Sequence, residues 1–155
     1  AHNLKKNDNM EKRKNHIQLL IHFAKVDNHF DERERQFIRQ VGKRIELKDE
    51  EIETIMNSQI NDKPPIPESE VQRYIIIDDL LNLVAIDKKI TPEEENEVKS
   101  VAEEFGFPSS MVDEIIEKLK RHIELGFDTN QISHSVKNSV FSLNNKATND
   151  KYDIQ

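Results

Sequence analysis

The stretch AKVDNHFDERE, residues 24–34, decides the fold, and a second version of it, VAIDKKITPEE, occupies residues 84–94. In both versions an apolar run stops at an aspartate, an apolar residue follows three positions later, and a helix-capping residue comes next. A glutamate stands three positions after the capping residue, which makes a capping box that starts an α-helix. Each version therefore predicts a corner between two helices. The residues are Asp27, Phe30, Asp31 and Glu34 in the first corner and Asp87, Ile90, Thr91 and Glu94 in the second.

Apolar side chains recur at helical spacing on both sides of the first corner. They predict helices over residues 10–26 and 50–59, with another helix between them that starts at Asp31. Gly42 lies inside this middle helix, where it costs about 1 kcal/mol relative to alanine unless a neighbouring helix packs closely against it.

The second half of the chain repeats this plan. Apolar spacing predicts helices over residues 71–86 and 112–125. Between them a helix is expected to start at Thr91, with Pro92 at its first position, and to end at Gly106. Helices account for all the periodic segments, so the chain is expected to be all-α.

The two halves align without a gap over residues 20–56 and 80–116, with five identities. The apolar pattern is the stronger indication, since thirteen positions are apolar in both copies. A single three-helix unit has too little helix to enclose its own apolar face, so two units should pack against each other. We therefore predict duplicated three-helix repeats packed about a pseudo-twofold axis.

The stretch NDKPPIPES holds three prolines and predicts a stiff connector between the repeats. We expect a single helical domain over residues 1–155. Its parts are a first repeat over about 10–60, the connector over about 61–69, a second repeat over about 70–126, and a polar C-terminal segment over 127–155. Apolar residues at helical spacing in this last segment predict one extra C-terminal helix: Ile132, Val136, Val140 and Leu143.

The composition excludes several classes of function. A net charge of −7 disfavours binding to nucleic acid and to anionic membranes, because both are negatively charged. The absence of cysteine excludes disulfides, thiolate metal sites and cysteine nucleophiles. No apolar run reaches the roughly 18 residues that a membrane span needs, and the basic N-terminus lacks the apolar core of a signal peptide. We expect a cytoplasmic protein that binds no nucleic acid and does not insert into a membrane.

The acidic side chains of the first corner, Asp27, Asp31 and Glu34, have two interpretations. Three carboxylates at a tight helical corner could hold a hard cation, Ca²⁺ or Mg²⁺ rather than Zn²⁺. The same residues could instead act within the protein. Asp31 and Glu34 form the capping box, and Asp27 can accept hydrogen bonds from loop amides or from the next helix.

Asp87 and Glu94 present the same choice at the second corner, although Lys88 and Lys89 beside Asp87 would oppose a cation. An EF-hand is excluded at both corners, because the twelfth position of each loop is apolar where a bidentate glutamate is required. The candidate metal ligands are Asp27, Asp31, Glu34, Asp87 and Glu94.

Asp78 and Asp79 lie inside the most apolar stretch of the sequence. An unpaired buried carboxylate is costly, so we expect a partner such as arginine or lysine, a helix N-terminus or a metal ion, with pairing inside the protein preferred. No pair of histidines has the spacing of a zinc motif, and His29 in the first corner is the one histidine near a candidate site. No catalytic motif is present, so we expect no enzyme.

The paired corners resemble the TerB-like family, which includes the tellurite-resistance protein TerB and the N-terminal domain of a membrane-anchored DnaJ-type co-chaperone. The resemblance covers roughly residues 17–125. It implies an all-helical duplicated fold and a non-enzymatic role in a bacterial stress-response or membrane-associated complex, with acidic residues connected with metal-ion binding. The family usually has glycine after the aspartate, where this chain has Asn28 and Lys88. The matching residues are Ala24, Asp27, Phe30 and Glu34, then Val84, Asp87, Ile90 and Glu94.

Two functions remain open at this point. The first is a TerB-like binding module of the bacterial stress response, related to tellurite resistance, with a divalent cation at its acidic corners. The second is a scaffold or adaptor for protein partners, monomeric or homodimeric, whose acidic corners are purely structural.

Overall fold

The computed structural model describes residues 2–25, 30–58 and 64–126, and the regular structure in these ranges is entirely α-helical. The expected all-α class is therefore confirmed for this part of the chain. The helices are α1 (His2–Ala24), α2 (Glu32–Arg44), α3 (Asp49–Asn57), α4 (Glu70–Ala85), α5 (Pro92–Glu104) and α6 (Ser109–Glu124).

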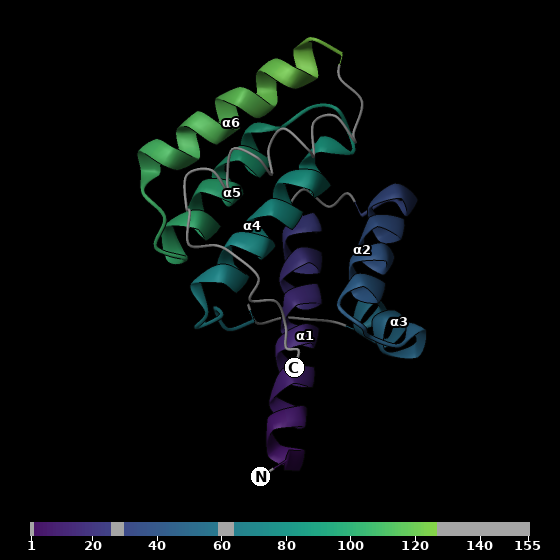
Figure 1. Ribbon diagram of the computed structural model, residues 1–155. Helices are drawn as coiled ribbons and strands as arrows, with labels where there is room; N and C mark the ends of the chain where they lie inside the picture. Colours follow the sequence, from purple (N-terminus) through teal and green to yellow (C-terminus); the bar gives the residue numbers. More distant parts are fainter. Residues whose placement is uncertain (1, 26–29, 59–63, 127–155) are drawn as a thin grey trace.

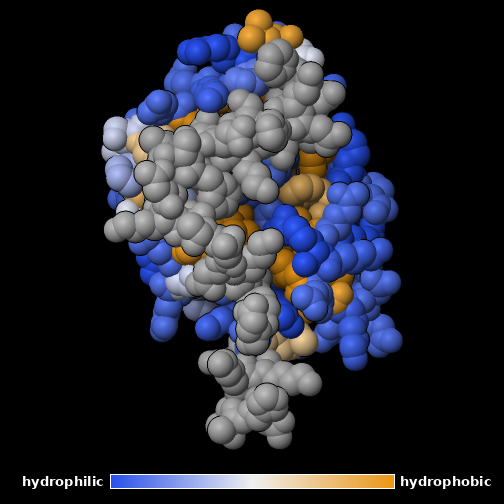
Figure 2. Space-filling model, viewed as in Figure 1, coloured by the Kyte–Doolittle hydropathy of each residue, from blue (hydrophilic) through white to orange (hydrophobic). Residues whose placement is uncertain are grey.

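Helix α4 lies at the centre of the molecule and packs against α1, α2, α5 and α6 (Figure 1). The first three helices lie on one side of it, and α5 and α6 lie on the other (Figure 1). Every residue of α4 from Ile76 to Ala85 is buried. This part of the helix is therefore surrounded by other parts of the protein rather than packed along one face only. The outer faces of the other helices carry the charged residues, and hydrophobic atoms show mainly through the middle of the face in Figure 2.

Helices α2 and α5 have the same length and begin and end 60 positions apart. Residues 31–50 and residues 91–110 agree at every position in both secondary structure and burial. An ion pair joins α2 to α3, Arg39 with Glu53 at 2.7 Å, and the equivalent residues Lys99 and Asp113 approach to 3.6 Å between α5 and α6.

The ends of α2 and α5 also match. The N–H of Leu47 donates to the carbonyl of Gly42 at 2.9 Å, and the N–H of Phe107 donates to the carbonyl of Ala102 at 3.0 Å. This is the Schellman ending, which requires a left-handed residue just before the donor. Gly106 fills that position in the second copy with φ +85°, and Glu46 fills it in the first with φ +68°.

The close packing expected at Gly42 is present. A Cβ atom on Gly42 would lie 2.6 Å from Cδ1 of Ile52, so α2 and α3 approach each other as closely as a glycine allows. The equivalent residues of the second copy are Ala102 and Val112. Ala102 has one side-chain carbon more than Gly42, and Val112 has one fewer than Ile52.

Some expected boundaries and faces were wrong. Helix α1 begins at His2 rather than near residue 10, and its first turns project beyond the other helices in Figure 1. Those turns lack an apolar stripe, so periodicity could not indicate them. Helix α6 begins at Ser109, three residues before its expected start. On α4 the apolar pattern of the sequence favours Ile75 on the main buried face, but Ile75 is only half-buried, whereas Ile76 is fully buried.

Candidate functional site

Both corners hold complete capping boxes. In the first corner the N–H of Asp31 donates to Oε1 of Glu34 at 3.1 Å, and the N–H of Glu34 donates to Oδ1 of Asp31 at 3.0 Å. In the second corner the N–H of Thr91 donates to Oε1 of Glu94 at 2.9 Å, and the N–H of Glu94 donates to Oγ1 of Thr91 at 3.1 Å. The predicted helix starts are confirmed. Glu34 and Glu94 are also buried, so both carboxylates lie under the corner rather than on the surface.

The pKa of Asp31 lies below its ordinary value. The main cause is the hydrogen bond from the Glu34 amide, which favours the charged carboxylate; partial burial opposes this, and the positive charge of Arg33 adds to it. The capping bond therefore keeps Asp31 ionised to a lower pH than an ordinary aspartate.

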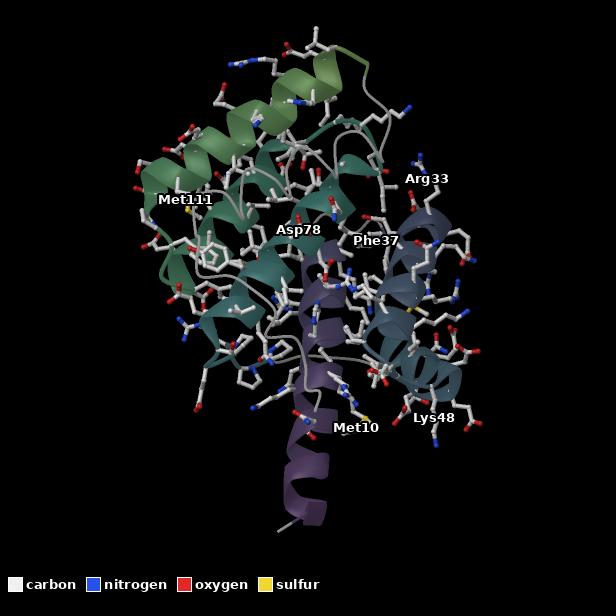
Figure 3. The ribbon with its side chains drawn as sticks, in the orientation of Figure 1. Met10, Arg33, Phe37, Lys48, Asp78 and Met111 are labelled. Carbon is white, nitrogen blue, oxygen red and sulfur yellow. The ribbon has the colours of Figure 1, made fainter. Side chains whose placement is uncertain are left out.

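Arg33 connects the two corners. Its Nη2 lies 2.8 Å from Oδ1 of Asp87, which follows α4, and 3.5 Å from Oδ2 of Asp31, which caps α2. The Arg33 side chain is two-thirds exposed, so the pair with Asp87 contributes no more than about 1 kcal/mol to stability. The pair matters more for the candidate metal site. Asp87, the carboxylate expected to bind a cation at the second corner, already faces the guanidinium of Arg33. Figure 3 shows Arg33 near the start of α2.

The five candidate metal ligands divide into two groups. Asp27 lies outside the described residues, as does His29, so the predicted metal set at the first corner stays a prediction. Asp31, Glu34, Asp87 and Glu94 each accept a hydrogen bond from within the protein. Among the described residues no group of three or more acidic or histidine side chains is close enough to hold a metal ion.

A buried ionic triad joins α1, α2 and α4. Asp79 accepts hydrogen bonds from Arg44 through both carboxylate oxygens, at 3.0 Å and 2.7 Å, and its Oδ2 lies 2.7 Å from Nε2 of His16. His16 and Asp79 have no exposed surface, whereas half of the Arg44 side chain is exposed. The expected pairing of a buried aspartate with arginine is confirmed for Asp79.

Burial alone raises the pKa of Asp79, but the hydrogen bonds and charges of His16 and Arg44 lower it by more, so the carboxyl group stays ionised. A histidine beside a carboxylate also occurs in general-base catalysis. Here neither side chain reaches the surface, so a substrate cannot approach them. We therefore assign the triad a structural role.

Sequence reasoning missed His16 and Arg33. Their partners lie 63 and 54 positions away, and no local pattern connects them. The internal alignment contains one indirect signal. The positions equivalent to His16 and Asp79 in the other copy are Ile76 and Leu19, both buried, so a polar pair stands where the other copy has two apolar residues.

His22 and His122, the other histidines whose side chains the structure describes, belong to no group of side chains that could hold a metal ion. Nδ1 of His122 lies 2.7 Å from the carbonyl oxygen of Lys118 in the preceding turn of α6, a helix-internal contact. His22 is half-buried on α1. No helix in the described ranges combines the length and the apolar character that crossing a membrane requires.

The corners and the helices define the class of structure, an all-α domain built from capped helical corners. Residues 1–57, which contain α1, α2 and α3, match the family model described as Tellurite resistance protein TerB. This match confirms the resemblance to the TerB-like family over the first repeat. Searches of curated proteins and of solved structures gave no match.

Proposed function

We propose that this chain is a non-enzymatic, cytoplasmic TerB-like binding module of the bacterial stress response, related to tellurite resistance, which acts through contacts with protein partners. The family match to the first repeat supports the relation to tellurite resistance. The net charge of −7 and the charged outer faces of the helices favour a protein partner over nucleic acid or an anionic membrane.

One observation carries the choice of a protein-binding role over a cation-binding one. Every described carboxylate of the two corners already has a partner inside the protein: Asp31, Glu34 and Glu94 bind helix N-termini, and Asp87 binds Arg33. A cation at the second corner would have to displace a guanidinium, with Lys88 and Lys89 exposed beside it. The corners are therefore best explained as structural elements.

We also propose that the two halves are copies of one unit, packed about a pseudo-twofold axis as a single domain. The equal lengths of α2 and α5 support this, as do the matching capping boxes and Schellman endings. The ion pairs between α2 and α3 and between α5 and α6 occupy equivalent positions and support it independently.

A divalent cation at the first corner is the second candidate function. It is favoured by the geometry of Asp31, whose Oδ1 serves the cap while its Oδ2 points to Arg33 at 3.5 Å, too far for a strong hydrogen bond. Asp27 and Oδ2 of Asp31 would supply ligands for Ca²⁺ or Mg²⁺, whereas Glu34 is buried and its Oε1 accepts the N–H of Asp31.

Deletion of the gene in its host bacterium tests the proposed role. We expect the deletion strain to be inhibited at lower tellurite concentrations than the parent strain. The wild-type gene and an Asp87→Asn variant should restore resistance equally, because Asp87 acts only in a weak surface pair. Unchanged tellurite sensitivity on deletion would contradict the relation to tellurite resistance. Failure of the Asp87→Asn gene alone, at normal protein level, would contradict the structural role of the second corner.

A further inference from the structure

Helix α4 carries two polar side chains that are buried away from the ionic triad. Asp78 and Asn82 lie one helical turn apart, and each is 8% exposed. Oδ1 of Asn82 is buried and accepts no hydrogen bond. A buried acceptor without a donor is costly, so this side of α4 is built to meet polar as well as apolar groups. Figure 3 shows Asp78 in the middle of α4.

The direction of these side chains follows from their neighbours on α4. Ile77 and Leu81 face α5 and α6, since they line a small apolar cavity with Val98 and Ile115. Asp79 faces α1 and α2 through the triad. Successive helical residues are about 100° apart, so Asp78 and Asn82 point outward between these two groups of helices.

Three half-buried apolar residues lie on the same outward face of α4 as Asp78 and Asn82. Together the five residues follow the helical spacing i, i+4, i+7, i+11 and i+15, and we call them the α4 stripe. The α4 stripe consists of Val71, Ile75, Asp78, Asn82 and Ile86. An apolar stripe with buried polar groups on an outward face is typical of a helix that is covered by another segment.

The equivalent side of α1 has a different character. The first four positions 60 residues earlier hold Glu11, Asn15, Gln18 and His22, all polar; Glu11 is exposed and the other three are half-buried. The fifth position is Val26, which is apolar like Ile86. The α4 stripe therefore has two more apolar positions than the equivalent face of α1, at Val71 and Ile75, and these favour a covering partner.

We propose that the α4 stripe is the docking site of the chain's own C-terminal segment, residues 127–155, through an amphipathic helix. The described chain leaves α6 at Gly126, whose φ of +80° ends that helix, and 29 residues follow, enough for a helix as long as the 16-residue α4. Ile132, Val136 and Val140 supply an apolar face at helical spacing. His134 and Lys137 beside them supply N–H donors for a face that contains a carboxylate and an amide oxygen.

Disulfide trapping in the full chain tests this docking, since the protein has no native cysteine. Two double variants pair the stripe with the middle of the segment: Ile75→Cys with Val136→Cys, and Asn82→Cys with Val136→Cys. A disulfide forms only between Cα atoms within about 7 Å, so it reports direct apposition. We expect at least one pair to form an intramolecular disulfide about tenfold faster than the control pairs under mild oxidation, because docking raises the local concentration of the two thiols.

The controls use the equivalent polar face of α1: Asn15→Cys with Val136→Cys, and His22→Cys with Val136→Cys. Helical circular dichroism and the melting temperature of every variant establish that it folds. Equal rates for the stripe and control pairs would overturn the proposal. Disulfide-linked dimers that form in place of intramolecular disulfides would also overturn it and would assign the α4 stripe to a second copy of the chain.

Discussion

Replacing Asp79 with leucine is expected to lower the free energy of unfolding by about 3–5 kcal/mol, the usual cost of removing one member of a buried ion pair. The substitution leaves fully buried His16 facing an apolar side chain and removes the two hydrogen bonds that Arg44 donates to Asp79. Urea unfolding followed by circular dichroism measures the effect, with the slope of the transition checking that unfolding stays two-state.

A compensated variant separates the ion pair from simple packing. The double substitution His16→Ile and Asp79→Leu introduces the residue types found at the equivalent positions, Ile76 and Leu19. Arg44 can turn to water because half of its side chain is exposed. We expect the double variant to be more stable than Asp79→Leu alone, since a buried apolar pair avoids the desolvation cost. Strictly additive losses would contradict the coupling of His16 and Asp79.

The contribution of Asp79 should depend on pH in a defined direction. Its pKa in the folded protein is lower than the ordinary 3.8, so its contribution to stability is complete above about pH 5 and is lost as the pH falls through the folded pKa. The difference in unfolding free energy between the wild type and Asp79→Leu should therefore shrink in strong acid.

Gly42→Ala is expected to destabilise the protein by up to about 2 kcal/mol, because the added methyl group overpacks the contact between α2 and α3 at a cost of about 1–3 kcal/mol. The new Cβ would meet Cδ1 and Cγ1 of Ile52 at 2.6 Å and 2.7 Å. This penalty exceeds the gain of about 1 kcal/mol that alanine normally brings to a helix interior. Thermal and urea unfolding of the single variant measure the net effect.

The second copy supplies the matched rescue. Combining Gly42→Ala with Ile52→Val reproduces the pair Ala102 and Val112, which occupies the same place between α5 and α6. The double variant should recover part of the stability, since Ile52→Val removes Cδ1, the nearer of the two atoms that the new Cβ would meet. If Ile52→Val does not rescue Gly42→Ala, the two helix contacts are not equivalent, and the proposed duplication loses a main support.

The corners could be predicted because their interactions are local. A capping residue and its glutamate are three positions apart, so the sequence itself shows the pairs Asp31 with Glu34 and Thr91 with Glu94. The same holds for Gly106, since a helix that ends in the left-handed conformation favours glycine. Gly42 was informative because glycine inside a helix needs a packing reason.

The connections between helices could not be predicted, because each requires knowledge of which faces meet. The pairs His16 with Asp79 and Arg33 with Asp87 join residues more than 50 positions apart. Sequence reasoning identified Asp79 as a buried carboxylate that needed a partner, but many basic residues could have supplied it. The start of α1 was missed for a different reason: residues 2–9 contain a single apolar residue, Leu4, so no apolar spacing indicates its first turns.

We propose that the acidic corners are structural and that the chain acts through protein contacts. Isothermal titration calorimetry of the full chain with Ca²⁺, Mg²⁺ and Zn²⁺ tests the structural role of the corners most directly, with Asp27→Asn and Asp87→Asn as matched variants of the two corners. We expect no saturable heat for any of the three ions. Saturable 1:1 binding that Asp27→Asn abolishes and Asp87→Asn preserves would contradict it and would assign a cation to the first corner.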